Sequence, residues 1–197
     1  MKLIGLTGSI GMGKSTTAAL FRRAGLAVYD ADRAVHRLSG RGGRAVPAIA
    51  ELFPEAVKDG VVDRARLGAL VFDDPPALKK LEAILHPLVQ EERRRFLRRA
   101  RAARRPLVVL DIPLLLETGG EAEVDYVAVV SCPSFLQRAR ALGRPGMTEA
   151  KLAAIRARQM PDDEKRRRAD CVIRTGLGKR PVIRQILTIC RLLRGKN

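Results

Sequence analysis

A glycine-rich segment near the start of the chain has the residue types and the spacing of a phosphate-binding loop. Residues 8–15 read Gly-Ser-Ile-Gly-Met-Gly-Lys-Ser, which fits the pattern G-x-x-x-x-G-K-[ST]. In such loops backbone N–H groups surround the phosphates of a nucleotide. Glycines at positions Gly8, Gly11 and Gly13 would let the backbone approach the phosphate oxygens with no side chain in between. The segment therefore predicts a site for nucleotide phosphates.

The elements expected around this loop are those that the motif requires. Residues 2–6 read as a short buried strand and residues 14–24 as a helix, so the loop joins a strand to a helix. The positive end of the helix dipole would add to the attraction for anionic oxygen. Lys14 would reach the β- and γ-phosphates, and the Ser15 hydroxyl would bind Mg²⁺. The alternative is a glycine-rich turn that merely begins a helix, and the agreement between motif and setting disfavours it.

Acidic residues come at the ends of two expected strands. The segment Asp30-Ala31-Asp32 follows the second strand, and Asp111 ends the third. Ligand sites of α/β proteins form at this carboxyl edge of the sheet. Asp32 would face the phosphates from the acceptor side, or it would be the N-cap of a helix that starts near Arg33. Asp111 would help to hold Mg²⁺, or it would make ordinary turn hydrogen bonds.

A further segment carries arginines that suit phosphate chemistry. Residues 135–143 read as a helix, and the spacing of Arg140 and Arg144 would place both guanidinium groups on one helical face. Pro145 would then break the helix, and Thr148 would begin another. A short helical lid with arginines suits a phosphoryl-transfer enzyme, which must exclude water from the reaction. The alternative is a basic surface helix.

The rest of the chain alternates short apolar runs with helical segments. The runs lack clean alternation, which is typical of a parallel sheet covered on both faces. We predict an α/β fold of the P-loop NTPase type, a three-layer sandwich with a five-stranded parallel sheet, a helical substrate-binding insertion and a helical lid. The expected strands are residues 2–6, 26–29, 107–110, 126–130 and 171–173.

The same pattern predicts one domain with two inserted parts. A long, mostly helical insertion separates the second and third strands, with helix breakers at Pro75-Pro76 and at Pro87. This insertion would form a substrate lobe. The predicted boundaries are a core of about 1–32, 104–137 and 150–197, a substrate lobe of about 33–103 and a lid of about 138–149.

The charge of the chain raises the question of nucleic acid. The formal net charge is +17, and arginines crowd residues 93–105. Only 4% of the residues are aromatic and tryptophan is absent, so little is available to stack on bases. An apolar stripe of Leu88, Val89, Phe96 and Leu97 would leave these arginines on a solvated helical face. We therefore expect no specific nucleic-acid partner, and a general attraction for anionic metabolites.

Length and cysteine content indicate where such a protein works. The 197 residues suit one compact domain, and no apolar run approaches the roughly 18 residues that a membrane span needs. The cysteines, Cys132, Cys171 and Cys190, are scattered among apolar residues and read as reduced core thiols. We expect a cytoplasmic protein with no membrane partner. The sequence leaves the oligomeric state unknown.

Several separated segments together resemble one family, the dephospho-coenzyme A kinases. They span nearly the whole chain in the expected order, and the Asp-Ala-Asp and Leu-His-Pro-Leu segments make the resemblance specific. Ser9, Leu116 and Arg174 depart from the usual pattern of the family. The segments are Ile4–Thr16, Val28–Asp32, Leu85–Leu88, Asp111–Glu117, Gln137 with Arg140 and Arg144, Gln159–Pro161, Glu164-Lys165 and Ala169-Asp170.

The resemblance implies transfer of the γ-phosphoryl group of ATP, with Mg²⁺, to the ribose 3′-hydroxyl of dephospho-coenzyme A. It also implies a fold like that of nucleoside monophosphate kinases, with a mobile lid. Asp32 would orient the 3′-hydroxyl or accept its proton, His86 would lie in the acceptor pocket, and Arg140 and Arg144 would belong to the lid. The ATP-binding residues would be Gly8, Gly11, Met12, Gly13, Lys14, Ser15 and Thr16.

Two other functions remain open at the level of sequence. A P-loop with a lid does not name its acceptor, so the chain would also suit a kinase for another small alcohol or nucleotide. From a different class, a nucleotide-dependent nucleic-acid-binding protein would use the arginines for phosphate contacts, and its affinity would then depend steeply on salt.

Overall fold

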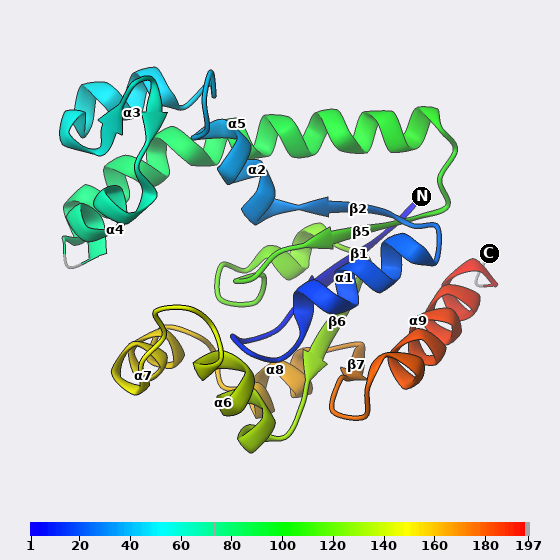
Figure 1. The fold of residues 1–197 in the computed structure, drawn as a ribbon. Helices are drawn as coiled ribbons and strands as arrows, with labels where there is room; N and C mark the ends of the chain where they lie inside the picture. Colours follow the sequence, from blue (N-terminus) through cyan, green and yellow to red (C-terminus); the bar gives the residue numbers. More distant parts are fainter. Residues whose placement is uncertain (73, 196–197) are drawn as a thin grey trace. The chain divides into compact units, whose positions relative to one another are not determined.

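The computed structural model describes residues 1–72 and 74–195 of the chain (Figure 1). The chain forms two compact units. The core unit comprises Met1–Tyr29 and the chain from Ala100 onward, and the insertion unit comprises Asp30–Arg99. The elements are β1 (Lys2–Thr7), α1 (Lys14–Arg23), β2 (Ala27–Asp30), α2 (Ala31–Leu38), α3 (Val46–Leu52), η1 (Pro54–Ala56), β3 (Val57–Lys58), β4 (Val61–Val62), α4 (Arg64–Phe72), α5 (Pro75–Ala102), β5 (Leu107–Asp111), η2 (Gly120–Glu123), β6 (Tyr126–Ser131), α6 (Ser134–Leu142), α7 (Glu149–Ala157), α8 (Asp162–Arg168), β7 (Cys171–Arg174) and α9 (Lys179–Arg194).

The five expected strands form one sheet in the order β2-β5-β1-β6-β7. Strand β1 pairs in parallel with β5 and with β6, and β6 pairs in parallel with β7. Because β1 lies at the centre, the loop that follows it leaves the sheet at the carboxyl edge between β5 and β6. The predicted α/β fold with a five-stranded sheet is confirmed.

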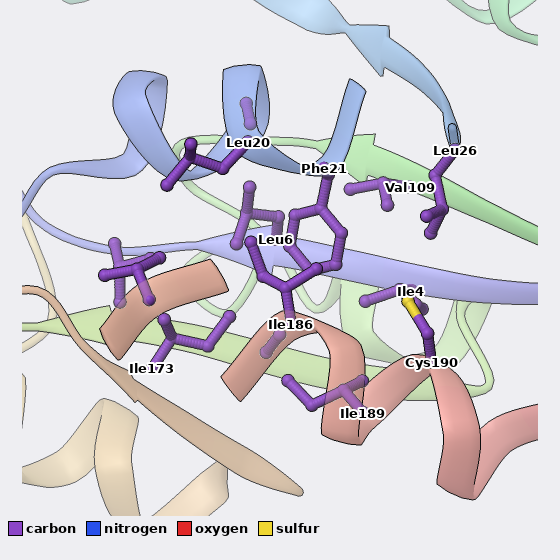
Figure 2. Packing of buried hydrophobic residues seen from close by; sticks show 14 of the residues in the cluster. Ile4, Leu6, Leu20, Phe21, Leu26, Val109, Ile173, Ile186, Ile189 and Cys190 are labelled. Carbon is purple, nitrogen blue, oxygen red and sulfur yellow. The ribbon is translucent and has the colours of Figure 1, made fainter. Parts of the chain in front are cut away.

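Apolar side chains cover both faces of this sheet, as continuous apolar strands require. Successive residues of β6 point to opposite faces: Ala128 and Val130 pack in one cluster, and Val127 and Val129 pack in another. The first cluster also holds apolar residues of α1 and α9. Figure 2 shows ten of its labelled side chains: Ile4, Leu6, Leu20, Phe21, Leu26, Val109, Ile173, Ile186, Ile189 and Cys190. Helices α1 and α9 therefore cover one face of the sheet, and the other face is covered by apolar residues of the segment 112–124 and by Met160 and Ala169, which flank α8.

The position of helix α1 is set by its apolar face, which packs against this sheet. Thr17, Leu20 and Phe21 are buried at the expected spacing of three and four residues. The helix ends where predicted, because Gly25 takes a positive φ of 83° just after the C-cap. The packing of α1 thus holds the helix N-terminus, and the loop before it, against the sheet edge.

The insertion unit has its own apolar core and a helix that differs from the prediction. Helix α5 begins at Pro75, as a proline in the first turn allows, but it runs on through Pro87. The prediction of a break at Pro87 is wrong. Leu81, Leu85 and Leu88 of this helix pack in the unit's apolar cluster, and this packing outweighs the loss of one backbone hydrogen bond at the proline.

The arginine-rich part of the chain lies on an exposed surface. Leu88, Val89, Phe96 and Leu97 are half-buried, as expected of an apolar stripe. Around them most of the arginines face solvent, and Arg95 pairs with Glu91 one helical turn away at 2.8 Å. The exposed arginines are Arg94, Arg95, Arg98, Arg99, Arg101, Arg104 and Arg105.

Candidate active site

The phosphate-binding loop runs from the end of β1 to the start of α1, and its glycines need both their backbone angles and their small size. Gly8, Gly11 and Gly13 have φ values of 155°, 78° and 95°. A Cβ atom on Gly11 would lie 2.5 Å from the backbone oxygen of Gln137, and one on Gly8 would lie 2.3 Å from Val130. The loop is therefore pressed against α6 and β6, and only glycine fits these positions.

The first turn of α1 is arranged to receive an anion. Its N-cap is Gly13, which has no side chain to bond the free N–H groups, and the first turn carries no acidic residue. Lys14, Ser15 and Thr16 form that turn, and the hydroxyls of Ser15 and Thr16 belong to exposed residues. Free N–H groups and the helix dipole together favour a phosphate at this point.

Lys14 is held by Asp111 across the neighbouring strand. Its Nζ atom lies 2.6 Å from Asp111 Oδ1, and the two side chains are 14% and 4% exposed. Asp111 reaches this place because β5 pairs in parallel with β1, which sets Asp111 opposite Leu6 at the carboxyl edge. The structure thus brings together two residues that the sequence singled out 97 positions apart.

The oxygen donors at this edge fit Mg²⁺ in kind. Ser15 offers a hydroxyl and Asp111 a carboxylate, and Mg²⁺ in nucleotide sites takes one or two such ligands besides phosphates and water. Within residues 1–72 and 74–195 there is no group of three or more His, Cys, Asp or Glu side chains that could hold a metal ion. The assignment of Ser15 and Asp111 as magnesium ligands stays a prediction.

Arg140 contacts the loop through Thr175. Its guanidinium donates to Thr175 Oγ1 at 3.1 Å and to the Thr175 carbonyl at 3.0 Å, and Thr175 Oγ1 in turn donates to the carbonyl of Met12 at 2.6 Å. Thr175 directly follows β7, at the same carboxyl edge as Asp111. The buried Thr175 hydroxyl therefore links the Arg140 guanidinium to the backbone of the phosphate-binding loop.

Arg144 does not share a helical face with Arg140. Helix α6 ends at Leu142 with Gly143 as its C-cap, so Arg144 lies beyond the helix and is exposed. The predicted common face is wrong, because it required the helix to continue for two more residues, to Arg144. The next helix begins as expected: Thr148 caps α7 by accepting from the Lys151 N–H at 3.2 Å, and Glu149 pairs with Arg138 of α6.

Asp32 and His86 belong to the insertion unit. Asp32 is exposed in the first turn of α2, and His86 is exposed on α5. The N-cap of α2 is Asp30, whose Oδ1 accepts from the Arg33 N–H at 3.0 Å. The alternative role of Asp32 as a helix cap is therefore wrong, because the helix begins at Ala31. The proposed roles of Asp32 and His86 toward the acceptor stay predictions.

Sequence reasoning missed side chains that hold the loop from outside. Gln137 Nε2 donates to the carbonyl of Ile10 at 2.9 Å, and Gln159 Oε1 accepts from the Ile10 N–H at 3.0 Å. Both glutamines stood within segments that carry the family resemblance, but the residue type alone indicated no contact. The contact of Thr175 could have been anticipated from the sequence, since this residue follows an expected strand at the sheet edge where ligands bind.

A buried ion pair supports the segment around Gln159. Lys165 of α8 is fully buried, and its Nζ lies 2.6 Å from Glu117 Oε1. The same carboxylate oxygen accepts from the Met160 N–H at 3.0 Å. Ser131, at the end of β6, donates to Asp162 Oδ2 at 2.7 Å. Residues 160–165 are therefore held by two other parts of the core unit, Glu117 and the end of β6 at Ser131.

A cavity of about 1100 Å³ opens beside the loop within the core unit. It borders the loop at Ser9 and Met12 and extends to Leu136, Gln159 and Leu177. The Ser9 hydroxyl on its wall is buried and has no hydrogen-bond partner in the part of the chain that is described. The cavity shows that the loop has open space on one side and packed side chains on the other.

Replacing Gly11 by alanine should damage the loop more than an equal change at Gly25. Both glycines have a similar positive φ, which costs alanine about 1–2 kcal/mol. A Cβ on Gly25 meets nothing within 4 Å, whereas one on Gly11 meets the Gln137 carbonyl oxygen at 2.5 Å. We expect the clash in Gly11→Ala to cost about 1.4 kcal/mol or more of ATP-binding free energy, which raises the Kd for ATP by about tenfold or more. Calorimetric titration with ATP checks this, and equal affinities in the two variants would contradict it.

Cys132 should be unreactive in the folded protein although it lies beside the loop. Burial raises the pKa of its thiol, and the thiolate is the reactive form. The structure contains no disulfide among the described residues, and Cys171 and Cys190 also have pKa values raised by burial. We expect slow alkylation of all three thiols by iodoacetamide near pH 7.5 and fast alkylation after unfolding. Rapid labelling of native Cys132, found by mass spectrometry, would show that the loop opens.

In the described part of the chain, no helix is both long enough and apolar enough to cross a bilayer.

Comparison with known proteins assigns this loop and sheet to one family. The dephospho-CoA kinase family model matches residues 2–178. A dephospho-CoA kinase of Mesorhizobium japonicum is 56% identical over 197 residues, covering 100% of this chain and 99% of that protein. One from Paramagnetospirillum magneticum is 63% identical over 166 residues, covering 84% and 78% of the two chains.

Solved structures agree with the fold. A crystal structure of a Thermus thermophilus protein superposes with a TM-score of 0.84 at 38% identity, covering 100% of this chain and 98% of the other. A shikimate kinase from Acinetobacter baumannii has the same fold at a TM-score of 0.51 and 21% identity, covering 100% and 95%. With a family model over residues 2–178 and a full-length relative at 56% identity, the chain belongs to the dephospho-CoA kinase family.

Proposed function

We infer that the protein transfers the γ-phosphoryl group of ATP to the ribose 3′-hydroxyl of dephospho-coenzyme A, giving coenzyme A and ADP. This reaction is the last step of coenzyme A synthesis. The observation that carries the inference is the glycine loop with Lys14 at the uncapped start of α1, in a chain of the dephospho-CoA kinase family.

The transfer we propose is direct, with no covalent intermediate on the enzyme. The 3′-oxygen forms a bond to the γ-phosphorus as the bond from that phosphorus to the bridging oxygen breaks, and the electron pair leaves with ADP. Such a transition state is loose, so positioning and charge supply most of the rate. Asp32 aligns the 3′-hydroxyl and takes its proton late in the reaction, and His86 lines the acceptor pocket.

The positive charges stabilise the phosphoryl oxygens. Lys14, Arg140 and Arg144 are the residues that we assign to this role, with Gly8, Gly11, Met12, Gly13 and Thr16 binding ATP through the loop and the first helical turn. Lys14 pairs with Asp111 in the structure, and we propose that it exchanges this partner for the β- and γ-phosphates when ATP binds. Mg²⁺, held by Ser15 and Asp111, would neutralise phosphate charge.

The lid and the substrate lobe are part of the same proposal. Residues 138–149 would close over the phosphates to exclude water, and the insertion unit would hold the acceptor. The cytoplasm suits the reaction, because it supplies ATP and keeps the three free cysteines reduced.

One experiment tests the acceptor directly. The protein is supplied with Mg-ATP and dephospho-coenzyme A, ADP release is followed, and the new phosphate is located by phosphorus NMR. We expect phosphate on the ribose 3′-oxygen. A panel of other alcohols, including shikimate, gluconate and nucleosides, is run in parallel. Faster ADP release with one of them, or phosphate at another position, would overturn the assignment.

A further inference from the structure

The middle of the phosphate-binding loop is a β-turn, a structure whose central peptide can in general take either of two orientations. The Met12 N–H donates to the Ser9 carbonyl at 3.2 Å, which closes the turn Ser9-Ile10-Gly11-Met12. Gly11, in the third position, has a φ of 78°, while Ile10 has no positive φ, so the turn is of type II. Types I and II differ by a flip of the Ile10–Gly11 peptide, and that flip reverses the direction of the Gly11 N–H.

Two glutamines hold both polar backbone atoms of Ile10. Gln137 Nε2 donates to the Ile10 carbonyl at 2.9 Å, and Gln159 Oε1 accepts from its N–H at 3.0 Å. A carbonyl only accepts and an N–H only donates, so these partners also fix which end of each side-chain amide faces Ile10. Gln137 is 5% exposed and is packed against Gly11, which leaves its side chain little room to turn.

Thr175 holds the next carbonyl of the loop in the same way. Its hydroxyl donates to the Met12 carbonyl at 2.6 Å and is itself oriented by Arg140. A trans peptide points its C=O and its N–H in opposite directions, and the described part of the chain has no cis peptide. Fixing the carbonyls of Ile10 and Met12 therefore fixes the directions of the Gly11 and Gly13 N–H groups, which are donors of the phosphate cradle.

We propose that Gln137, Gln159 and Thr175 are positioning residues that hold the loop in its phosphate-binding form before ATP arrives. A loop that is ordered in advance does not lose that conformational freedom on binding, so affinity for phosphate rises. Gln137 and Arg140 both lie on α6, and Gln159 follows α7. The residues that bond Ile10 of the phosphate-binding loop, Gln137 and Gln159, thus come before and after the predicted lid of residues 138–149. The proposal rests on the nucleotide site assigned above.

The test uses the different chemistry of the two glutamines. Gln159 acts as an acceptor, so Gln159→Glu keeps its hydrogen bond, whereas Gln159→Met loses it. Gln137 acts as a donor, so Gln137→Glu and Gln137→Met both lose the hydrogen bond. At about 0.5 M salt, which screens the carboxylate charge that Gln159→Glu adds near the phosphates, we expect the Kd for Mg-ATP and for Mg-ADP to rise roughly 3- to 10-fold, the factor that one hydrogen bond is worth, in every variant except Gln159→Glu. The KM for dephospho-coenzyme A should stay unchanged.

A matched control loses a comparable contact far along the strands from the loop. Tyr126, at the first residue of β6, donates through its hydroxyl to the Asp170 carbonyl at 3.3 Å, and Tyr126→Phe removes that bond. This variant should bind Mg-ATP like the original protein. If the buried Gln137 variants fail to fold, the comparison of Gln159→Met with Gln159→Glu decides, because Gln159 is only half-buried.

Two outcomes would overturn the proposal. One is an unchanged Kd for both nucleotides in folded Gln159→Met. The other is an equal loss of affinity in Gln159→Glu and Gln159→Met. Binding is measured without an acceptor, so these results stand apart from the assignment of dephospho-coenzyme A. If the unaltered protein binds Mg-ATP but does not phosphorylate dephospho-coenzyme A, only the proposed function fails.

Discussion

Replacing Asp32 by asparagine should lower turnover by about 10²-fold or more, the scale on which a general base contributes. Asparagine has the same shape but cannot take the proton of the 3′-hydroxyl. The fold should be little affected, because Asp30 and not Asp32 caps α2, and Asp32 is exposed. ATP binding should be close to normal, since the loop and Lys14 are unchanged. The measurements are the rate of ADP release at saturating substrates and the Kd for ATP.

A control separates the chemistry of Asp32 from its charge. Glu51, on α3 of the same unit, is also an exposed acid, and Glu51→Gln removes one negative charge in the same way. This variant should turn over normally. Near-normal turnover in Asp32→Asn would take Asp32 out of the reaction, and a joint loss of turnover and ATP affinity would place its role in nucleotide binding.

Replacing Lys14 by alanine should reduce both phosphate binding and transfer, with transfer falling by roughly 10²- to 10³-fold. The lysine is the one charged side chain that the loop itself contributes, and its charge acts where negative charge develops on the γ-oxygens. The change should also destabilise the fold by about 3 kcal/mol, because it removes one partner of the buried Lys14–Asp111 ion pair. Thermal unfolding and single-turnover kinetics measure the two effects separately.

A double variant distinguishes the stability effect from the catalytic one. In Lys14→Ala with Asp111→Asn, the buried side chain at position 111 is neutral and no longer needs the lysine charge, so much of the lost stability should return. Transfer should stay low, because the cation at the γ-phosphate is still missing. Recovery of transfer together with stability would contradict the role of Lys14, and so would unchanged kinetics in the single variant.

The glycine loop was predictable because its geometry is local. Gly8, Gly11 and Gly13 stand within six residues of one another, and the positive φ angles that they take are ones that glycine adopts readily, so the motif can be recognised from the residue types alone. The strands were predictable for a related reason: a continuous apolar run such as Leu107–Leu110 is typical of a strand that is buried on both faces of a sheet. The place of Asp111 beside Lys14 then follows from parallel pairing.

Other features depended on contacts that local patterns do not contain. Helix α5 continues through Pro87 because its apolar side chains find a core to pack against, although propensity alone predicts a break. Arg144 falls outside α6 because the helix ends at Leu142, two residues before the position that a shared face with Arg140 required. Asp30 took the capping role that the sequence left open for Asp32.

The sequence by itself determined the loop, the strands and the family, because each depends on residues that are neighbours in the chain or on a motif read letter by letter. Only the tertiary structure decided which side chains hold the loop. Gln137 and Gln159 stand 127 and 149 residues from Ile10, and their amides meet its backbone only because α6 and the segment after α7 pack beside the loop. No sequence pattern around a glutamine indicates a hydrogen-bond partner so far away in the chain, since the distance and the angle of that bond are set by tertiary packing.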